Sequence, residues 1–217
     1  MTSNSTPPPA SDKDQRLSAL RLLLRERPGA DKADESLALV EPFTTPIPGG
    51  GSVTLAPAWY DLIGDLQVRL VRETPDALLT LEAEELDALG LAGDAAIELA
   101  LANQRRQTGA PTVQPWHNLQ RVGSSEEEFD SNWFLDRAFW RARLAEHPQG
   151  LVVAVPRVDA LLFAPAGDDP AVASMRRGIP QLHEEAGDWR LSSALYLFRD
   201  DRWTVLQPAA PAPAEAG

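Results

Sequence analysis

The feature that most constrains the fold lies between residues 151 and 163, where two apolar runs flank a short polar joint. Leu151 to Val155 are all apolar, Arg157 and Asp159 follow Pro156, and a second apolar run reaches Phe163. An apolar run of this length without polar alternation is typical of a buried strand. The region therefore predicts a pair of apolar strands that are joined at a polar interruption.

The remainder of residues 129–206 predicts two helices and a hairpin around this strand pair. One helix is expected to begin near Asp130 and to end before Pro148, and another to run from Asp168 until Pro180 ends or bends it. Apolar stretches on both sides of residues 199–202 predict a closing hairpin. Four of the six tryptophans lie in this last third, which makes it the clearest folded core of the chain.

The first half of the chain predicts a less regular mixture of elements. Leu17, Leu20 and Leu24 recur at helical spacing before Pro28, and this spacing predicts a helix over 11–27. The other expected elements are a short strand over 36–43, a helical turn over 57–63, a strand over 65–73, and helices over 80–89 and 94–107. Because helices and strands alternate irregularly, we expect an α+β fold with a mixed or antiparallel sheet packed with several helices.

Composition shifts divide the chain into five predicted segments. A polar, proline-rich lead over 1–10 and an Ala/Pro-rich tail over 207–217 are expected to be disordered. Between them we expect an N-terminal α+β subdomain over 11–107, a linker or lid over 108–128, and a C-terminal α+β subdomain over 129–206.

Charge and composition exclude several classes of function. The net charge is −12, which disfavours binding to nucleic acid or to an anionic membrane and leaves a basic protein partner as one candidate. The chain has no cysteine and three histidines, so no thiolate chemistry is available, and neither a metal site nor a cofactor is predicted. With no secretory signal and no apolar run long enough to span a bilayer, the expected location is the cytoplasm.

The motif search finds no catalytic set. The glycine run 49–51 lacks the lysine of a phosphate loop and indicates a flexible turn. Ser192 could act as a nucleophile only if His183 were its base, and no known motif supports that pairing. The acidic run 126–128 with Asp130 could bind a divalent cation, but a solvated acidic face before a helix is the simpler interpretation.

Five residues of the last third are candidates for binding. Arg157 and Asp159, two positions apart, could form a structural ion pair or a polar binding spot within apolar surroundings. Asp130 is a candidate for a polar site at the start of a helix. Trp133 and Trp140 are most simply core residues, but with the neighbouring arginines they could also mark a partner surface.

Four stretches, taken in order, resemble the YtpQ-like bacterial family. They are residues 81–104 (LEAEELDALGLAGDAAIELALANQ), 129–136 (FDSNWFLD), 150–163 (GLVVAVPRVDALLF) and 191–206 (LSSALYLFRDDRWTVL). The resemblance covers roughly residues 37–206 and implies an α+β cytoplasmic bacterial protein. It implies no reaction and no site residues, because the family has no established activity.

The sequence therefore favours a non-enzymatic protein-binding module, such as an adaptor or a toxin-neutralising immunity-type partner. This hypothesis depends on the acidity, the lack of a catalytic set and the aromatic last third. One alternative is an enzyme that uses Glu126, Asp130 or Asp159 as a base or metal ligand. Another alternative is a small-molecule sensor.

Overall fold

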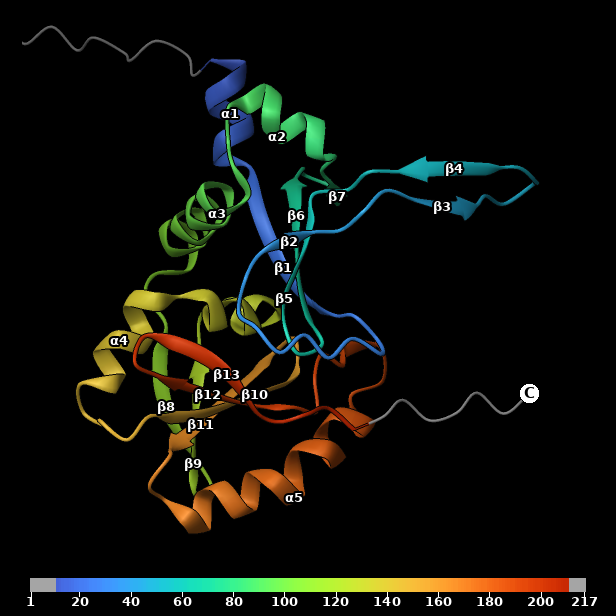
Figure 1. The fold of residues 1–217 in the computed structure, drawn as a ribbon. Coiled ribbons are helices and arrows are strands. Elements are labelled where there is room, and N and C mark those ends of the chain that lie inside the picture. The colour runs from blue at the N-terminus through green and yellow to red at the C-terminus, as the bar shows by residue number, and fades with distance from the viewer. Residues whose placement is uncertain (1–10, 211–217) are drawn as a thin grey trace, which may run out of the picture.

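The computed structural model describes residues 11–210, which form two large antiparallel sheets and a separate two-stranded hairpin, with helices packed around the large sheets (Figure 1). The predicted lead over 1–10 and residues 211–217 of the predicted tail lie outside the described residues. All pairings between the named strands are antiparallel, so the expected α+β class is confirmed and the sheets are antiparallel rather than mixed. None of the helices in residues 11–210 combines the length and the hydrophobicity that a transmembrane span requires.

The N-terminal part of the chain builds a five-stranded sheet. Its strands are β1 (Leu20–Glu26), β6 (Leu66–Glu73), β5 (Trp59–Ile63) and β2 (Ala38–Leu39) in that order, with β7 (Leu78–Thr80) paired to β6. β6 confirms the strand expected over 65–73, and β2 is shorter than the strand expected over 36–43. The helical turn expected over 57–63 is wrong, because Trp59 to Ile63 pair with β6 as a strand.

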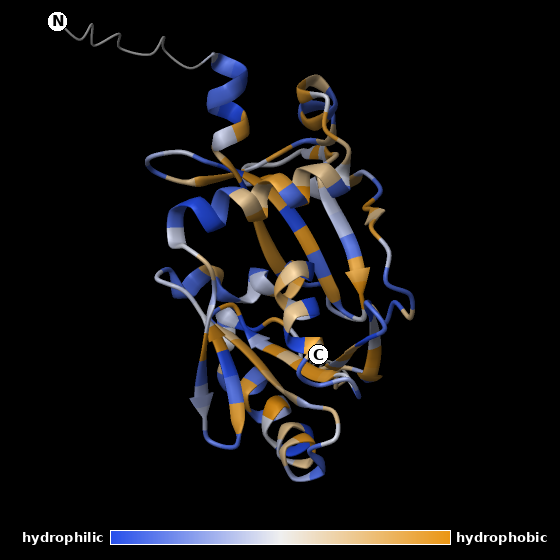
Figure 2. Cartoon of the chain, turned by 90° about the vertical axis from the view of Figure 1, so that its left-hand side faces the viewer, coloured by the Kyte–Doolittle hydropathy of each residue, from blue (hydrophilic) through white to orange (hydrophobic). Residues whose placement is uncertain are grey.

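The helix expected over 11–27 is also wrong for most of its length. Only α1 (Asp12–Ser18) is helical, with Ser11 and Asp14 forming its capping box, and β1 begins two residues after it. Leu20, Leu22 and Leu24 are buried at every second position, which is the period of a strand. The alternation of apolar and polar residues along the strands is visible in Figure 2.

Two helices follow the five-stranded sheet, as the sequence predicts. They are α2 (Ala83–Leu89), which ends at Gly90 with a positive φ of 72°, and α3 (Gly93–Thr108). α3 packs along β1, and Asn103 donates hydrogen bonds of 2.8 Å to the carbonyls of Leu17 and Leu20. This helix therefore covers the edge strand β1 of the five-stranded sheet (Figure 1).

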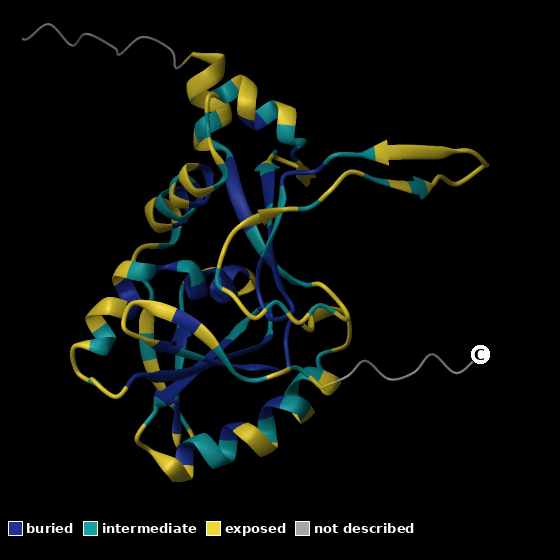
Figure 3. Cartoon of the chain, in the orientation of Figure 1, coloured by how far each residue is buried: buried dark blue, intermediate teal, exposed yellow. Residues whose placement is uncertain are grey.

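A separate hairpin, β3 (Phe43–Pro46) with β4 (Ser52–Leu55), projects away from the body of the molecule (Figure 3). The predicted turn at Gly49, Gly50 and Gly51 forms its tip, and all three glycines have positive φ between 91° and 100°. Phe43 at the base of the hairpin contacts Trp59, with 5.7 Å between the ring centres.

The C-terminal part builds a six-stranded sheet. Its order is β13 (Arg202–Gln207), β12 (Leu195–Arg199), β10 (Leu151–Arg157), β11 (Ala160–Pro165), β9 (Leu119–Gly123) and β8 (Thr112–Trp116). The strand pair β10–β11 and the hairpin β12–β13 confirm the expectations for these stretches. The expected linker or lid over 108–128 is wrong, because β8 and β9 pair within this sheet.

Both faces of the six-stranded sheet are covered, and this explains the apolar runs of β10 and β11. One face packs against α5 (Asp169–Glu185), which continues through Pro180 instead of ending there, and a short 3₁₀ turn (η2, Gly187–Trp189) follows it. The other face packs against η1 (Glu127–Leu135), α4 (Arg137–Leu144) and the five-stranded sheet. The single helix expected from Asp130 to Pro148 is thus split into a 3₁₀ segment and a short α-helix.

The two predicted subdomains share one hydrophobic core, which contains leucines of β1 and β6 together with aromatic residues of β12 and β13. Asn132 of η1 links them by hydrogen bonds. Its amide accepts from the Leu24 N–H at 3.1 Å and donates to the Leu22 carbonyl at 2.9 Å and to Gln104 at 3.1 Å. Residues 207–210 of the predicted tail are also tied to this body, because the Ala210 N–H donates to the Ser193 hydroxyl at 2.8 Å.

Candidate functional site

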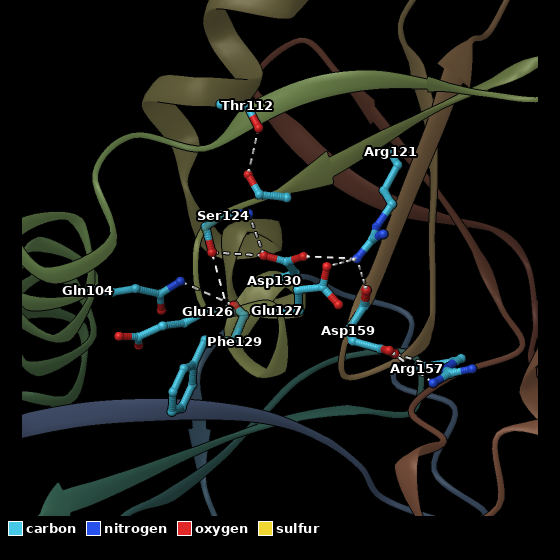
Figure 4. A network of polar contacts seen from close by, with 11 residues as sticks. Gln104, Thr112, Arg121, Ser124, Glu126, Glu127, Phe129, Asp130, Arg157 and Asp159 are labelled. Atoms are coloured by element: carbon cyan, nitrogen blue, oxygen red, sulfur yellow. Dashed lines mark hydrogen bonds and ion pairs between the residues drawn. The ribbon is translucent and has the colours of Figure 1, made fainter.

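Arg121 of β9 brings together several of the polar residues that the sequence singles out (Figure 4). Its Nη2 lies 3.4 Å from Oδ2 of Asp130, 3.1 Å from the carbonyl oxygen of Asp159 and 3.6 Å from Oε1 of Glu127. This arginine therefore connects η1 to the turn between β10 and β11.

The Asp130 carboxyl is fully buried in this network. Its Oδ1 accepts hydrogen bonds from the backbone N–H of Ser124 at 2.7 Å and from the Ser124 hydroxyl at 2.8 Å. Burial raises the pKa of Asp130 to about 6, although the Ser124 donors and Arg121 favour the charged form. A pocket of about 250 Å³ is lined by its neighbours Glu128 and Phe129, and Asp130 is not among the lining residues.

A general base or metal ligand must reach its substrate or ion, and the Asp130 side chain has no exposed surface. Its hydrogen bonds instead hold the start of η1 against β9 and the following loop. The structure thus gives Asp130 a role in positioning η1, and the expectation that this residue forms a polar binding site is corrected.

Arg157 and Asp159 form a bidentate ion pair, as the first of the two interpretations of this polar joint predicts. Nε and Nη2 of Arg157 donate to the two carboxylate oxygens of Asp159 at 2.8 and 2.9 Å. Arg157 ends β10, whereas Asp159 lies in the turn before β11, so the two do not share a strand. The side chains are 40% and 21% exposed, so we expect the pair to contribute at most about 1 kcal/mol to stability.

Trp133 and Trp140 are completely buried, which corrects the suggestion that they mark a partner surface. Nε1 of Trp140 donates to the carbonyls of Trp133 and Phe134 at 2.9 and 3.0 Å. Phe134 stacks on Trp203 with 4.1 Å between the ring centres. These rings form the centre of the shared core, as the simpler interpretation predicts.

The other sequence candidates do not form a catalytic or metal site. Glu126 and its two acidic neighbours are exposed, and the described residues contain no group of three or more carboxylates or histidines that could hold a metal ion. Ser192 is buried and lies 2.6 Å from Oδ1 of Asp65, which also accepts from Tyr196 at 2.7 Å. Burial raises the pKa of Asp65. Among the described residues, no hydrogen bond joins Ser192 to His183, the base that a nucleophilic serine here would need.

The structure adds a cleft that the sequence does not indicate. The cleft has a volume of about 640 Å³ and lies between α3, the segment 33–37 and the start of β13. We call it the acidic cleft, because its lining includes Asp34, Glu35, Asp94, Glu98 and Asp201 but only the basic residues Arg137 and Arg202. Its apolar lining comes mainly from Leu62, Ile97, Leu101, Leu135 and Trp203.

Two of the five carboxylates in the acidic cleft are neutralised by arginines. Glu35 pairs with Arg137 and also accepts from the backbone N–H of Trp203 at 2.9 Å. Asp201 accepts two hydrogen bonds from Arg141, at 2.8 and 2.7 Å, and this contact lowers the pKa of Asp201. These ion pairs connect the start of β13 to α4 and to the 33–37 segment. The other three carboxylates of the acidic cleft are Asp34, Asp94 and Glu98.

Asp34, Asp94 and Glu98 are exposed. The charge of Asp34 acts on the nearby Lys32 and favours its charged form, whereas Asp94 and Glu98 form no ion pair with another described residue. The field of Asp94 also reaches β5, because burial and then the charges of Asp87 and Asp94 raise the pKa of Tyr60. The acidic cleft therefore combines an apolar floor with unneutralised negative charge at its rim.

We found no match to this chain among family models, curated proteins or solved structures. The acidic cleft is therefore assigned from its geometry, and its lining residues come from five separate stretches of the chain: 33–37, 62, 94–101, 135–137 and 201–204. The only signal in the sequence that points to them is the excess of acidic residues.

Proposed function

We propose that the chain is a non-enzymatic partner-binding protein, an adaptor or the neutralising partner of a toxin, that holds a basic segment of its partner in the acidic cleft. The observation that carries this proposal is a set of exposed carboxylates above an apolar floor, of which Asp94 and Glu98 have no cationic partner among the described residues. Lysine and arginine side chains suit such a site, because their aliphatic stems pack on apolar surface while their charged ends meet carboxylates.

The net charge of −12 supports the same choice of partner. A strongly acidic surface attracts basic proteins over long distances and raises the rate of association, and salt weakens this attraction. The same charge disfavours nucleic acid as the partner. The resemblance to a bacterial family supports the further proposal that the protein acts in the bacterial cytoplasm.

The carboxylate enzyme is the weaker candidate. Asp130, which has a raised pKa, is inaccessible, and the Asp159 carboxylate is engaged by Arg157. Glu126 and its two acidic neighbours are exposed, so they lack the enclosed site in which a catalytic carboxyl group works.

The test compares two double variants, each of which removes two negative charges, but from different places on the protein. Asp94→Asn with Glu98→Gln neutralises the acidic cleft, and Glu84→Gln with Glu184→Gln neutralises two exposed residues outside it. Each protein is used to capture partners from the native host, and the captured protein is then titrated by calorimetry at low and high salt.

We expect the wild type and the control variant to bind one and the same basic protein, with an affinity that falls as salt is raised. The cleft variant should bind it at least about tenfold more weakly, since each lost charge contact is worth on the order of 1 kcal/mol. Equal binding by the cleft variant, or failure of the wild type to bind any basic protein, would exclude the acidic cleft as the docking site.

A further inference from the structure

The hairpin of β3 and β4 stands apart from both large sheets. It forms a two-stranded sheet of its own and projects from the body of the molecule (Figure 3). We call residues 43–55, which include both strands and the turn between them, the arm. A two-stranded hairpin that stands alone is marginally stable in water, and further strands or a packed face are needed to stabilise it. The arm is therefore a candidate for contact with another molecule.

The two faces of the arm differ in polarity. Phe43 and Leu55 lie across from each other, and Val53, two positions along β4, lies on the same face. Val53 is 39% exposed, so this apolar face is only partly covered. On the opposite face the hydroxyl oxygens of Thr44 and Thr54 lie 3.2 Å apart. The arm thus has the alternation of a sheet with one face to bury.

The two edges of the arm differ as well. On β3, Pro46 has no N–H to offer to a further strand, whereas β4 contains neither proline nor a charged residue, the devices that usually protect an exposed edge. The Ile47 N–H donates to the Gly51 carbonyl at 3.3 Å, and residues of β4 beyond this pair bond alternately toward β3 and away from it. Ser52 and Thr54 therefore direct their backbone N–H and carbonyl groups to the open edge.

Charge selects what can pair with this edge. Residues 42–60 contain no Asp, Glu, Lys or Arg and form the longest such stretch of a chain whose net charge is −12. A neutral edge offers no attraction to a basic or acidic partner, and it is the one long surface stretch at which a second acidic copy meets no opposing charge. The four residues of β4 alone extend about 13 Å, which is longer than the roughly 8 Å over which physiological salt screens charge. The arm therefore holds two acidic bodies apart while their neutral edges meet.

The open edge of β4 also complements itself. When two copies of β4 pair antiparallel about a twofold axis at Val53, Ser52 of each copy lies across from Thr54 of the other. This register pairs the outward backbone groups of both residues in both copies and places the two Val53 side chains next to each other on the apolar face. The outer strands of the resulting sheet are the two β3 strands, whose proline limits further pairing. The assembly is thus closed at two copies.

We propose that the arm binds the arm of a second copy of this chain through β4, so that a four-stranded antiparallel sheet joins two acidic bodies. The contact buries the backbone groups of the open edge and extends the apolar face of each arm. No residue of the stretch 42–60 lines the acidic cleft, so the proposal does not depend on the proposed function.

The experiment measures the mass of the full chain by sedimentation equilibrium over a range of protein concentrations, at 50 mM and at 500 mM sodium chloride. We expect the mass to rise with concentration from 23.6 kDa to twice that value. Salt screens the repulsion between the two bodies, so the Kd of the dimer should fall at least about threefold at the higher salt. This is the opposite of the salt dependence expected for a basic partner in the acidic cleft.

Two pairs of variants locate the contact. Val53→Asp places like charges side by side at the twofold axis, and Thr54→Pro removes an outward N–H while leaving the bonds to β3 in place; each should raise the Kd at least about tenfold. Leu79→Asp changes a leucine of β7 that is 44% exposed, and Thr44→Pro makes the same backbone change on the other strand of the arm. Both controls should leave the Kd of the dimer unchanged.

A wild type that keeps the mass of one chain up to about 1 mM at the higher salt overturns the proposal, and so does a dimer that salt weakens. Equal effects of Thr54→Pro and Thr44→Pro, or of Val53→Asp and Leu79→Asp, would place the contact elsewhere and overturn it as well. No residue of the arm belongs to the hydrophobic clusters of the described residues. At a concentration where the wild type is a single chain, Val53→Asp should therefore keep its melting temperature, and a marked drop would show that the edge serves the fold and contradict the proposal.

Discussion

The raised pKa of Asp130 leads to a measurable dependence of stability on pH. The carboxyl is fully buried and its pKa is about 6, compared with 3.8 for an unperturbed aspartate. A carboxyl with a higher pKa in the folded state holds its proton more tightly there than in the unfolded chain. Its contribution to the free energy of unfolding is therefore fully present below pH 4 and is lost as the pH rises through 6.

The size of this effect follows from the difference between the two pKa values. About two pKa units correspond to roughly 3 kcal/mol of stability that is lost between pH 4 and pH 7. Asp130→Asn keeps the acceptor for the two Ser124 donors but cannot ionise. Relative to the wild type, this variant should be of similar stability at pH 4 and more stable by up to about 3 kcal/mol at pH 7.

Urea unfolding of both proteins, followed by tryptophan fluorescence at a series of pH values, measures this difference. Because all other titrating groups are shared, they cancel when the two curves are subtracted. Ser124→Ala gives a second check, since losing the hydroxyl donor should move the midpoint of the Asp130 transition to higher pH. A difference that does not vary with pH, or a wild type that gains on the variant as the pH rises, would show that attraction to Arg121 outweighs burial and would refute the reasoning.

Three further substitutions, two at contacts between the two sheets and one directly before β10, are each measured as the free energy of unfolding in urea. Tyr196→Phe removes a 2.7 Å hydrogen bond to the buried carboxyl of Asp65 and should cost about 2 kcal/mol at neutral pH; an unchanged midpoint would contradict this role. Asn132→Ala leaves an N–H and a carbonyl of β1 without partners and should cost about 3 kcal/mol, whereas a cost below about 1 kcal/mol would mean that water replaces the amide. Gly150→Ala, at φ of 106°, should cost about 2 kcal/mol, and a neutral effect would argue against the positive φ.

The elements that the sequence predicts best are those whose pattern has one interpretation. β11, and β10 up to its last residue Arg157, are apolar without interruption, and the structure covers both strands on both faces. β1 shows the opposite case, because its leucines fit a helical face together with Leu17 and also fit a strand at every second position. Pairing with β6 and packing against α3 decide between the two, and these contacts join residues far apart in the sequence.

The acidic cleft could not be predicted for a similar reason. Its exposed carboxylates include one in the segment 33–37 and two in α3, and its floor includes Trp203 at the other end of the chain. No local spacing relates these residues. The sequence shows only that acidic groups are in excess, not which of them remain without a partner after folding.

The stretch 129–136 shows how polar residues can be misread as a binding site. Asp130, Ser131 and Asn132 are all buried, and each is engaged by hydrogen bonds to other elements, with the Ser131 N–H donating to the carbonyl of Val158 at 3.0 Å. Buried polar groups must be satisfied for the fold to be stable, so their presence follows from packing alone. A charge that folding leaves without a partner, as at Asp94 or Glu98, has no such explanation. In this protein the search for ligands should therefore begin with the unmatched charges, not with the polar residues of the core.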